Sequence, residues 1–202
     1  MYIARILYPV KVLGPGNRVG IWFDGCEHHC KGCSNPELWE FQETYLTKLE
    51  VIEKLIYAIN KEHTIDGFTL TGGDPFLQPD ALRKLLPVLN SISTDIICYT
   101  GYSHDELKVK YDDILSEMAV LIDGRYIEER NTGIVLRGSD NQNVIILNES
   151  FAEKYRDYLS TARNEIQNFR TKDTIISVGI HDRDYMGEID AFAKAQGFVQ
   201  TK

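Results

Sequence analysis

The chain has 202 residues, of which 43% are hydrophobic and 26% are charged, and its formal net charge at pH 7 is −8. This length and composition fit a single globular domain with one sizeable hydrophobic core. The negative charge argues against nonspecific binding to nucleic acid and against docking on anionic membranes, because both need a basic face.

Membrane insertion and secretion are not expected either. No apolar run approaches the roughly 20 residues that a membrane-spanning helix needs. Residues 1–18 are interrupted by basic residues and proline, so they lack the continuous apolar core of a signal peptide. The sequence therefore predicts a cytoplasmic protein with neither nucleic acid nor membrane as a partner.

Short β-rich segments alternate with amphipathic helical segments along the chain. The predicted strands are 19–23, 67–70, 95–99, 119–123, 143–147 and 174–178. The predicted helices are 47–60, 78–92, 103–111, 151–166 and 186–196. This alternation indicates βαβ units. The expected fold class is α/β, with a mostly parallel sheet that is either open or curled into a partial (β/α) barrel.

Several helix boundaries carry recognisable signals. Thr47 with Glu50 and Ser103 with Glu106 have the spacing of capping boxes, in which two side chains satisfy free backbone amides at the helix start. Pro87 should kink or shorten the second helix, because proline has no amide donor and its ring clashes with the preceding turn.

The loops that follow the first four predicted strands hold most of the polar signals. They read DGCEHHCKGC, TGGDP, TGYSHDE and DGR. In α/β folds, ligands bind at the carboxyl ends of the parallel strands, which lie at one edge of the sheet. We therefore expect these loops to converge on a single active site.

The first of these loops contains Cys26, Cys30 and Cys33 within eight residues, and the only other cysteine is Cys98. In a reducing compartment, clustered cysteines indicate metal binding or catalysis before they indicate disulfides. The CxxxCxxC spacing suits a metal centre, because each turn of the loop brings another sulfur towards the same point. Three cysteines without any metal remain the plainer alternative.

Two kinds of metal centre are compatible with three clustered thiols. A zinc site would need a fourth ligand, either His28 or His29 from the same loop or Cys98 from the third predicted strand. So tight a loop would struggle to give tetrahedral angles, and Cys98 lies in an apolar strand where a buried, inert thiol is expected. The two histidines are therefore interpreted as surface or loop-packing residues. A [4Fe–4S] cluster held by three thiolates leaves one iron open to another ligand.

The second loop, TGGDPF at 71–76, strengthens the cluster interpretation. Its two glycines let the backbone approach a ligand closely, and its carbonyls and amides can bind a charged amino-acid group. A tight strand-to-helix turn, with Asp-Pro starting the next helix, is the plainer interpretation. Because the loop follows the strand next to the cysteine loop, we favour ligand binding.

These motifs together resemble a known family. CxxxCxxC with GGDP is similar to the radical S-adenosylmethionine superfamily. Further motifs narrow the resemblance to the activating proteins of anaerobic (class III) ribonucleotide reductases, namely GPGNR at 14–18, YTGY at 99–102, LIDGRY at 121–126 and LRGSDNQ at 136–142. The matches run in order from Gly14 to Gln142 and cover most of the chain.

The resemblance implies the metal ligands and the cofactors. Cys26, Cys30 and Cys33 would hold one [4Fe–4S] cluster, and its open iron would take the amino and carboxylate groups of S-adenosyl-L-methionine. Beyond the cluster and this cofactor, no catalytic side chain is expected, because no protein acid or base is needed.

The resemblance also implies residues that bind the cofactor. Gly72, Gly73 and Asp74 match the motif that binds the methionine amino group. Gly32, Cys33 and Ser34 lie where the family's loop contacts the cofactor. Asp123 is a further candidate, for the ribose or a cation, and a strand-end turn with Gly124 is the equally plain alternative. The same two interpretations are open for Tyr99, Thr100, Ser139 and Asn141.

The implied reaction begins with one electron from the reduced cluster, supplied by a small flavin protein such as flavodoxin. The electron cleaves S-adenosylmethionine into methionine and a 5′-deoxyadenosyl radical. That radical takes a hydrogen atom from a glycine on the partner, the glycyl-radical subunit of an anaerobic ribonucleoside-triphosphate reductase. So difficult a cleavage needs a cluster of low potential and a pocket that is poor in water.

The end of the chain departs from the pattern of the family. We expect one radical S-adenosylmethionine domain over 1–202, with a core of about 14–147 and a C-terminal α/β extension of the same domain over 148–202. The extension would most simply lengthen the same sheet, or else contact a partner, and HDRD at 181–184 is too generic to decide. Asp140 also adds a charge where the family more often has a small residue.

Two alternative functions stay open on sequence grounds. A related radical enzyme could act on another glycyl-radical enzyme, on a peptide or on a small molecule. A zinc-binding adaptor without turnover belongs to a different class, and it would be colourless and stable in air.

Overall fold

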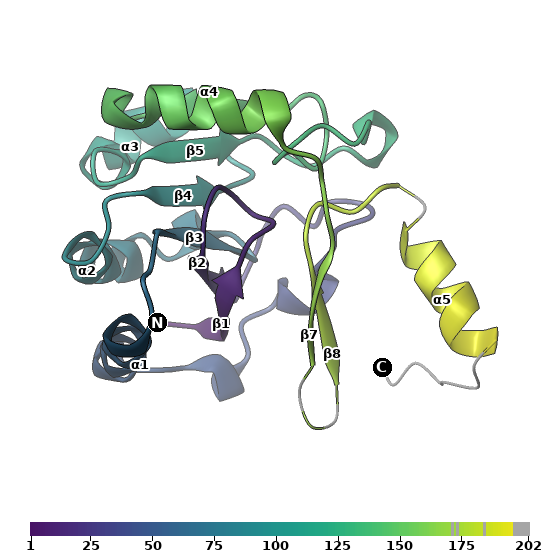
Figure 1. Ribbon diagram of the computed structural model, residues 1–202, viewed down its shortest axis with the longest axis horizontal. Coiled ribbons are helices and arrows are strands. Elements are labelled where there is room, and N and C mark those ends of the chain that lie inside the picture. Colours follow the sequence, from purple (N-terminus) through teal and green to yellow (C-terminus); the bar gives the residue numbers. More distant parts are fainter. Residues whose placement is uncertain (171, 173, 184, 196–202) are drawn as a thin grey trace.

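A six-stranded sheet forms the centre of the molecule, in the order β1-β2-β3-β4-β5-β6 (Figure 1). The computed structural model describes residues 1–202 except 171, 173, 184 and 196–202. The strands are β1 (Ile3–Val10), β2 (Arg18–Phe23), β3 (Gly67–Gly72), β4 (Ile96–Tyr99), β5 (Val120–Asp123) and β6 (Asn143–Ile146). Strands β2 to β5 pair in parallel, whereas β1 and β6 pair antiparallel to their neighbours. The fold is therefore mixed α/β with a mostly parallel central sheet.

Helices and a small hairpin surround this sheet. The α-helices of the described residues are α1 (Leu49–Glu62), α2 (Pro79–Asn90), α3 (His104–Leu115), α4 (Ala152–Thr161) and α5 (Tyr185–Ala195). Short 3-10 turns are η1 (Pro36–Leu38), η2 (Glu43–Tyr45), η3 (Pro75–Leu77), η4 (Glu128–Arg130) and η5 (Glu149–Phe151). Strands β7 (Gln167–Arg170) and β8 (Ile175–Val178) pair with each other in a separate antiparallel sheet. None of the described helices is long and apolar enough to cross a bilayer.

Both faces of the central sheet are packed, because successive side chains of a strand point to opposite faces. On β4, Ile96 and Cys98 join the core under α1, α2 and α3, whereas Ile97 joins the core under α4. Tyr155 of α4 is fully buried in this second core. The β7–β8 hairpin packs beside α4 on the same face, with Val178 buried against Trp22 and Leu38. The expected burial of Cys98 is confirmed.

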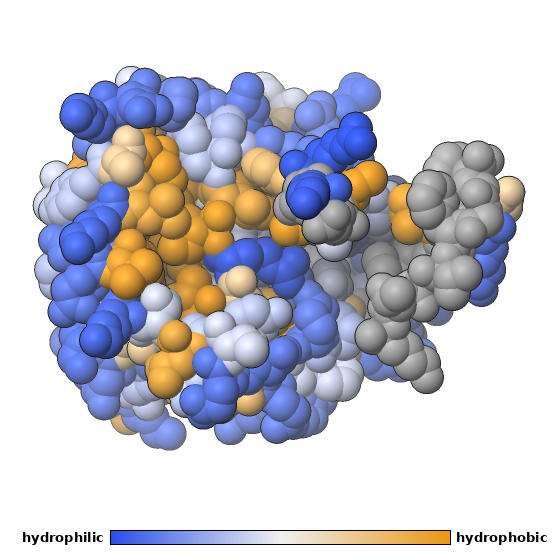
Figure 2. All heavy atoms as spheres, turned by 90° about the horizontal axis from the view of Figure 1, so that it is seen from below, coloured by the Kyte–Doolittle hydropathy of each residue, from blue (hydrophilic) through white to orange (hydrophobic). Residues whose placement is uncertain are grey.

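Helix α1 lies on the face of the molecule that is turned towards the viewer in Figure 2, where hydrophobic residues gather into a broad band. Only Ile52 and Ile56 of α1 are fully enclosed, whereas Val51 and Leu55 are exposed. The helix therefore rests on the sheet through one narrow stripe, as residues three to four apart on a surface helix do.

All of the predicted strands occur, each within two residues of its predicted bounds. The sequence did not reveal β1, because Pro9 lies inside it and most of its side chains are only partly buried. Proline is tolerated there because an edge strand has no partner on its outer side.

The C-terminal part corrects the expectation that 148–202 lengthens the same sheet. Only 143–147 adds a strand to it, as β6, and the predicted strand 174–178 pairs with β7 instead. The predicted helix 151–166 also ends early, at Thr161. Beyond this point the Asn164 side chain donates to the carbonyls of Gly133 and Ile134, and the chain turns into β7. The predicted helix 186–196 occurs as α5, with Gln196 outside the described residues.

The helix boundaries bear out one of the two capping boxes. Ser103 accepts the Glu106 amide and the Glu106 carboxylate accepts the Ser103 amide, so this box is confirmed. The box at Thr47 is wrong, because the Thr47 amide donates to the Met1 carbonyl and α1 starts after Lys48. Helix α2 continues through Pro87 and ends three residues later.

A buried ion pair fixes α4 to the sheet. The Arg18 side chain is fully buried and lies 3.2 Å from the Asp95 carboxylate, which also accepts bonds from Tyr155 and Lys154 of α4. Arg18 further donates to the carbonyl of Phe68 at 2.5 Å. Burial alone would raise the pKa of Asp95, but the Arg18 charge and the bonds from α4 outweigh it and lower the pKa.

Removing the Asp95 carboxylate should strongly destabilise the fold. Asp95→Ala leaves the Arg18 charge buried and unpaired, which costs about 3–5 kcal/mol of the free energy of unfolding. Lys154→Ala is the matched control, because the Lys154 side chain is 40% exposed and its loss should cost under about 1 kcal/mol. Urea denaturation measures the free energy of unfolding of both variants. Equal losses of unfolding free energy in the two would contradict the role given to the Arg18–Asp95 pair.

The same pair predicts a pH dependence. Because the folded-state pKa of Asp95 is lowered, its contribution is present above the ordinary aspartate range and is lost as pH falls through the folded pKa. The difference in unfolding free energy between wild type and Asp95→Ala should therefore shrink on acidification. A difference that grows at low pH would show that the carboxylate is not ionised in the folded protein.

Candidate functional site

The parallel register brings four strand ends to one edge of the sheet. Phe23 lies opposite Gly72, and Tyr99 lies opposite Ile122, so the loops after β2, β3, β4 and β5 start at the same level. These loops surround a cavity of about 440 Å³, a volume within the usual range for small-molecule sites. The expected convergence of the four loops is present in the structure.

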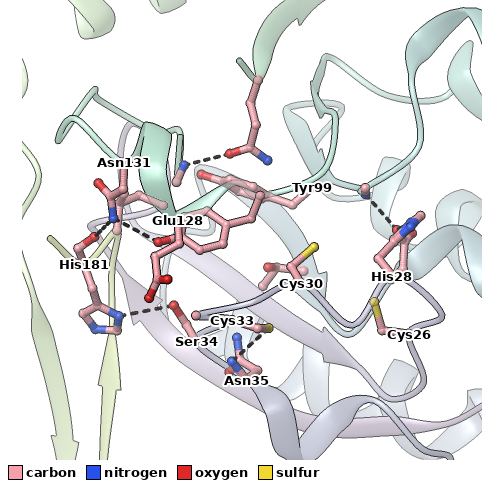
Figure 3. A pocket seen from close by; sticks show the side chains of 18 of the residues that line it. Cys26, His28, Cys30, Cys33, Ser34, Asn35, Tyr99, Glu128, Asn131 and His181 are labelled. Carbon is pink, nitrogen blue, oxygen red and sulfur yellow. Dashed lines mark hydrogen bonds and ion pairs between the residues drawn. The ribbon is translucent and has the colours of Figure 1, made fainter. Parts of the chain in front are cut away.

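The cavity collects nearly all of the residues singled out from the sequence. Those in its wall are Cys26, Cys30, Gly32, Cys33, Ser34, Gly72, Gly73, Asp74, Tyr99 and Thr100. Further lining residues from the loop after β5 are Gly124, Tyr126, Glu128, Asn131, Gly138 and Gln142. Asp123 is not among the lining residues. Figure 3 shows the three cysteines along one strand-end loop, with the His181 ring next to Ser34.

Backbone bonds hold the cysteine loop in place. The Cys26 amide donates to the Trp39 carbonyl at 2.8 Å, and the Gly25 amide donates to the Leu38 carbonyl at 3.0 Å. The Cys33 amide closes a turn onto the Cys30 carbonyl at 3.2 Å. The loop is thus tied at its start to the chain that follows it, and its three thiols are all free and partly exposed.

Backbone amides point at two of the sulfurs. The Asn35 amide donates to Cys33 Sγ at 3.4 Å (Figure 3). Burial raises the pKa of Cys26 to about 11, and the amides of His28 and His29 oppose this rise. Burial likewise raises the pKa of Cys33, opposed by the Asn35 amide. These partly buried thiols need a stabilising interaction in order to ionise. Backbone amides that donate to the sulfur provide one for thiolates that hold a metal.

The donor set fits an iron–sulfur cluster. Three free thiols on one short loop, with amides aimed at two of them, are the groups that such clusters use. Among the described residues, no three His, Cys, Asp or Glu side chains gather closely enough to hold a single metal ion.

Asp74 joins three of the loops through one buried carboxylate. It accepts the amide of Phe76 at 3.0 Å within its own loop, and the hydroxyl of Thr100 at 3.0 Å. It also accepts the amide of Gly101 at 2.8 Å and Nε2 of His28 at 3.0 Å. Its side chain is only 1% exposed. The carboxylate therefore fixes the loops after β2, β3 and β4 together.

His28 therefore has a more specific place than the surface or packing role expected from the sequence. Its ring packs edge-on against Tyr102, with centroids 4.6 Å apart, and its side chain is 10% exposed. His29 stacks on Trp39 and is half exposed, as expected of a loop-packing residue.

The glycines of TGGDPF are required by close backbone contacts. Gly72 has φ +109°, a conformation that other residues rarely adopt. A Cβ at Gly73 would collide with the carbonyl oxygen of Gly25. The amides of Gly73 and Asp74 donate at 2.8 Å to the carbonyls of Phe23 and Gly25. The loop after β3 thus lies directly against the cysteine loop.

Asp123 serves the packing of the strand end. Its carboxylate is buried, accepts the His104 amide at the start of α3 at 2.8 Å, and accepts the Asn143 side chain at 2.8 Å. Gly124 follows it in a turn with φ +96°. This geometry matches the strand-end interpretation.

The LRGSDNQ loop is braced by its own side chains. Gln142, which the sequence did not single out, accepts the amides of Gly138 and Ser139 and donates to the Gly124 carbonyl at 2.7 Å. Asn141 donates to the Arg125 carbonyl at 2.8 Å. A separate ion pair joins the unusual Asp140 to Arg130. Most of these polar side chains stabilise the conformation of the LRGSDNQ loop in the cavity wall.

Sequence reasoning missed one part of the wall. Residues 179–183, which follow β8, also line the cavity. His181 Nδ1 lies 3.5 Å from the hydroxyl of Ser34, which directly follows Cys33 (Figure 3). No local signal marks this segment, because the pairing of β7 with β8 and their packing on the sheet bring it there.

Comparisons with known proteins agree with this arrangement. The family described as "4Fe-4S single cluster domain" matches residues 12–145. The anaerobic ribonucleoside-triphosphate reductase-activating protein of Haemophilus influenzae is 39% identical over 144 residues, which cover 67% of this chain and 92% of that protein. Proteins of the same name from Enterobacteria phage T4 and Escherichia coli K12 are 34% and 31% identical, with 88% and 92% of their lengths covered. An iron–sulfur protein is therefore indicated rather than the zinc adaptor, and residues 146–202 lie outside the family match.

Gly73→Ala should damage the cysteine loop. The added Cβ meets the Gly25 carbonyl, so the two loops must separate, at a cost of about 1–3 kcal/mol in unfolding free energy. We expect the iron bound per chain after anaerobic reconstitution to fall as well. Gly187→Ala in α5 is the matched control, because a Cβ there has no neighbour within 4 Å. Iron content and stability equal to those of the control would contradict the close contact.

Proposed function

This chain belongs to the family of anaerobic ribonucleoside-triphosphate reductase-activating proteins, and on that premise we propose how its own residues perform the activation. It is an iron–sulfur enzyme, an activase that generates a glycyl radical. Its partner is an anaerobic ribonucleotide reductase.

We propose that Cys26, Cys30 and Cys33 hold one [4Fe–4S] cluster and leave one of its irons without a protein ligand. The observation that carries this proposal is that all three thiols and the TGGDPF loop line the same cavity. The fourth cysteine, Cys98, is fully buried in the core and is not among the lining residues. The open iron would therefore face the cavity rather than the protein.

When bound and reduced, the cluster would supply the electron that splits S-adenosyl-L-methionine into methionine and a 5′-deoxyadenosyl radical, and that radical would take a hydrogen atom from a glycine of the reductase. The chain's own part is to place the cofactor and to keep water away. Trp39, Tyr99 and Tyr126 give the cavity an aromatic lining that favours a water-poor site. A flavodoxin-like protein is the proposed electron donor.

Gly72, Gly73 and Asp74 are proposed to bind the amino-acid end of S-adenosyl-L-methionine. The Gly73 amide already donates to Phe23 at the end of β2, and the Asp74 amide donates to Gly25 in the cysteine loop. The carbonyls of the TGGDPF loop are therefore the groups that can receive an ammonium. The Asp74 carboxylate accepts four donors and so positions the loop. Gly32 and Ser34 line the facing side. Asp123 is left out of the ligand set.

The wider architecture is proposed on the same grounds. Four parallel strands with ligand loops at their carboxyl ends suit the partial barrel of radical S-adenosylmethionine enzymes. We propose one domain over 1–202, because the β7–β8 hairpin shares a hydrophobic core with β2.

Anaerobic cleavage of S-adenosylmethionine tests the ligand set. Reconstituted wild type should contain about four irons and four sulfides per chain and release 5′-deoxyadenosine when reduced. Cys30→Ala removes one of three ligands, so both iron content and release should fall to background. Cys98→Ala removes a thiol outside the cavity and should retain both.

Two results would count against this function. Release that persists in Cys30→Ala would exclude the thiol as a ligand, and no release from wild type would exclude the radical reaction. The partner is tested by adding anaerobic ribonucleotide reductase and looking for a glycyl-radical signal by electron paramagnetic resonance. If the enzyme cleaves S-adenosylmethionine but no glycyl-radical signal forms on the reductase, the radical acceptor is a different molecule.

A further inference from the structure

His28 stands between the first two cysteines of the loop, and its side chain is tied to a different loop. Ring atom Nε2 donates to Asp74 Oδ2 at 3.0 Å, and the side chain is 10% exposed. The neighbouring His29 stacks on Trp39 instead and is half exposed. The two adjacent histidines of CEHHC therefore have different surroundings, and the side chain of His28 is the one enclosed between the loops after β2, β3 and β4.

The turn after β4 encloses the His28 ring. Tyr102 packs edge-on against it with centroids 4.6 Å apart, and the Tyr102 hydroxyl donates at 2.6 Å to the carboxylate of Glu27. A Cβ built on Gly101 would lie 2.2 Å from Cδ2 of His28, and its three nearest atoms would all belong to this ring. Because carbon atoms pack about 3.5–4.0 Å apart, alanine at position 101 would have to displace the His28 ring.

The backbone of the same residue serves the cluster side of the loop. The amides of His28 and His29 stabilise the thiolate of Cys26 and so oppose the rise that burial causes in its pKa. The His28 carbonyl accepts the side chain of Arg125 from the loop after β5. Figure 3 shows His28 and Cys26 at the same end of the row of cysteines. The position of the His28 side chain therefore bears on the backbone that faces a proposed metal ligand.

We propose that His28 is a positioning residue for the cluster, whose side chain, through its bond to Asp74, keeps the backbone amides of its segment directed at the sulfur of Cys26. This inference rests on the proposed function, because Cys26 must be a cluster ligand. Reduction adds negative charge to the sulfurs of a cluster, so an amide that donates to a sulfur stabilises the reduced form. The bond between His28 and Asp74 therefore raises the reduction potential of the cluster and eases its one-electron reduction.

Two substitutions at His28 separate its hydrogen bond from its packing. His28→Phe keeps a ring against Tyr102 but removes the donor to Asp74, whereas His28→Gln keeps a donor near the position of Nε2. In His28→Phe, we expect the equilibrium constant for one-electron reduction of the cluster to fall about 3- to 10-fold. At 59 mV per tenfold, this is a shift of about 30–60 mV to more negative potential. His28→Gln should stay within about 2-fold of wild type.

The reduction potential is measured by anaerobic titration of the reconstituted enzyme with dithionite and viologen mediators, in the absence of S-adenosylmethionine. The electron paramagnetic resonance signal of the reduced cluster follows the titration, and iron content is measured on each sample. His29→Asn is the matched control. It removes the ring of the neighbouring histidine, and asparagine tolerates the φ of +46° at this position. Its potential should equal that of wild type.

Gly101→Ala tests the same contact without altering His28 itself. Because the new Cβ displaces the His28 ring, the potential should shift in the same direction as in His28→Phe. The shift should vanish in a His28→Ala background, where the atoms that the new Cβ meets are absent. A shift from Gly101→Ala that is equally large in both backgrounds would mean that Gly101 does not act through His28, and would overturn the proposal.

The remaining outcomes also decide the proposal. A wild-type potential in His28→Phe, or an equal shift in His28→Gln, would overturn it. If His28→Phe takes up no cluster while His28→Gln binds about four irons at the wild-type potential, the bond to Asp74 is required and the proposal stands. If neither variant takes up a cluster, a wild-type potential in Gly101→Ala overturns it and a more negative one supports it. A cluster that persists in Cys26→Ala would instead remove the proposed ligand set on which the inference rests.

Discussion

One buried carboxylate holds the functional edge of this protein together. Asp74 accepts hydrogen bonds from His28 in the cysteine loop, from the Thr100–Gly101 turn after β4, and from Phe76 in its own loop. The cysteine loop has no regular hydrogen-bonded pattern of its own before η1, so its position depends on such contacts from outside. The carboxylate accepts four donors from three loops, so its loss would remove four hydrogen bonds together.

The rest of the site follows from that arrangement. Parallel pairing of β2 with β3 sets the two loops side by side, and glycine at position 73 permits their backbones to touch. With this edge fixed, the three thiols and the TGGDPF loop line one cavity. Residues 179–183, which follow β8, complete the wall of this cavity. A cluster with an open iron and its cofactor would then share a single cavity, and radical chemistry requires such a site to be poor in water.

The sequence predicted the parts of the molecule whose signals are local. Thiol spacing, two adjacent glycines and short apolar runs are readable without knowing the fold, and the strands and the site cysteines lie where those signals indicate. What failed depends on contacts between distant segments. Met1 and Tyr2, just before β1, bond to Thr47 and Leu46 and so displace the first cap, and β8 pairs with β7 rather than with the main sheet. The hydrogen bond between His28 and Asp74 joins residues 46 positions apart, and no sequence pattern in either loop predicts it.

The central claim is that the three thiolates leave one iron open for the amino-acid group of S-adenosylmethionine. Electron–nuclear double resonance on the reduced, reconstituted enzyme tests it directly, using S-adenosylmethionine isotopically labelled at its amino nitrogen. The account predicts a hyperfine coupling between that nitrogen and the cluster spin, as expected for an atom bonded to iron. A cluster spectrum that S-adenosylmethionine does not change, with no coupling to the label, would contradict it.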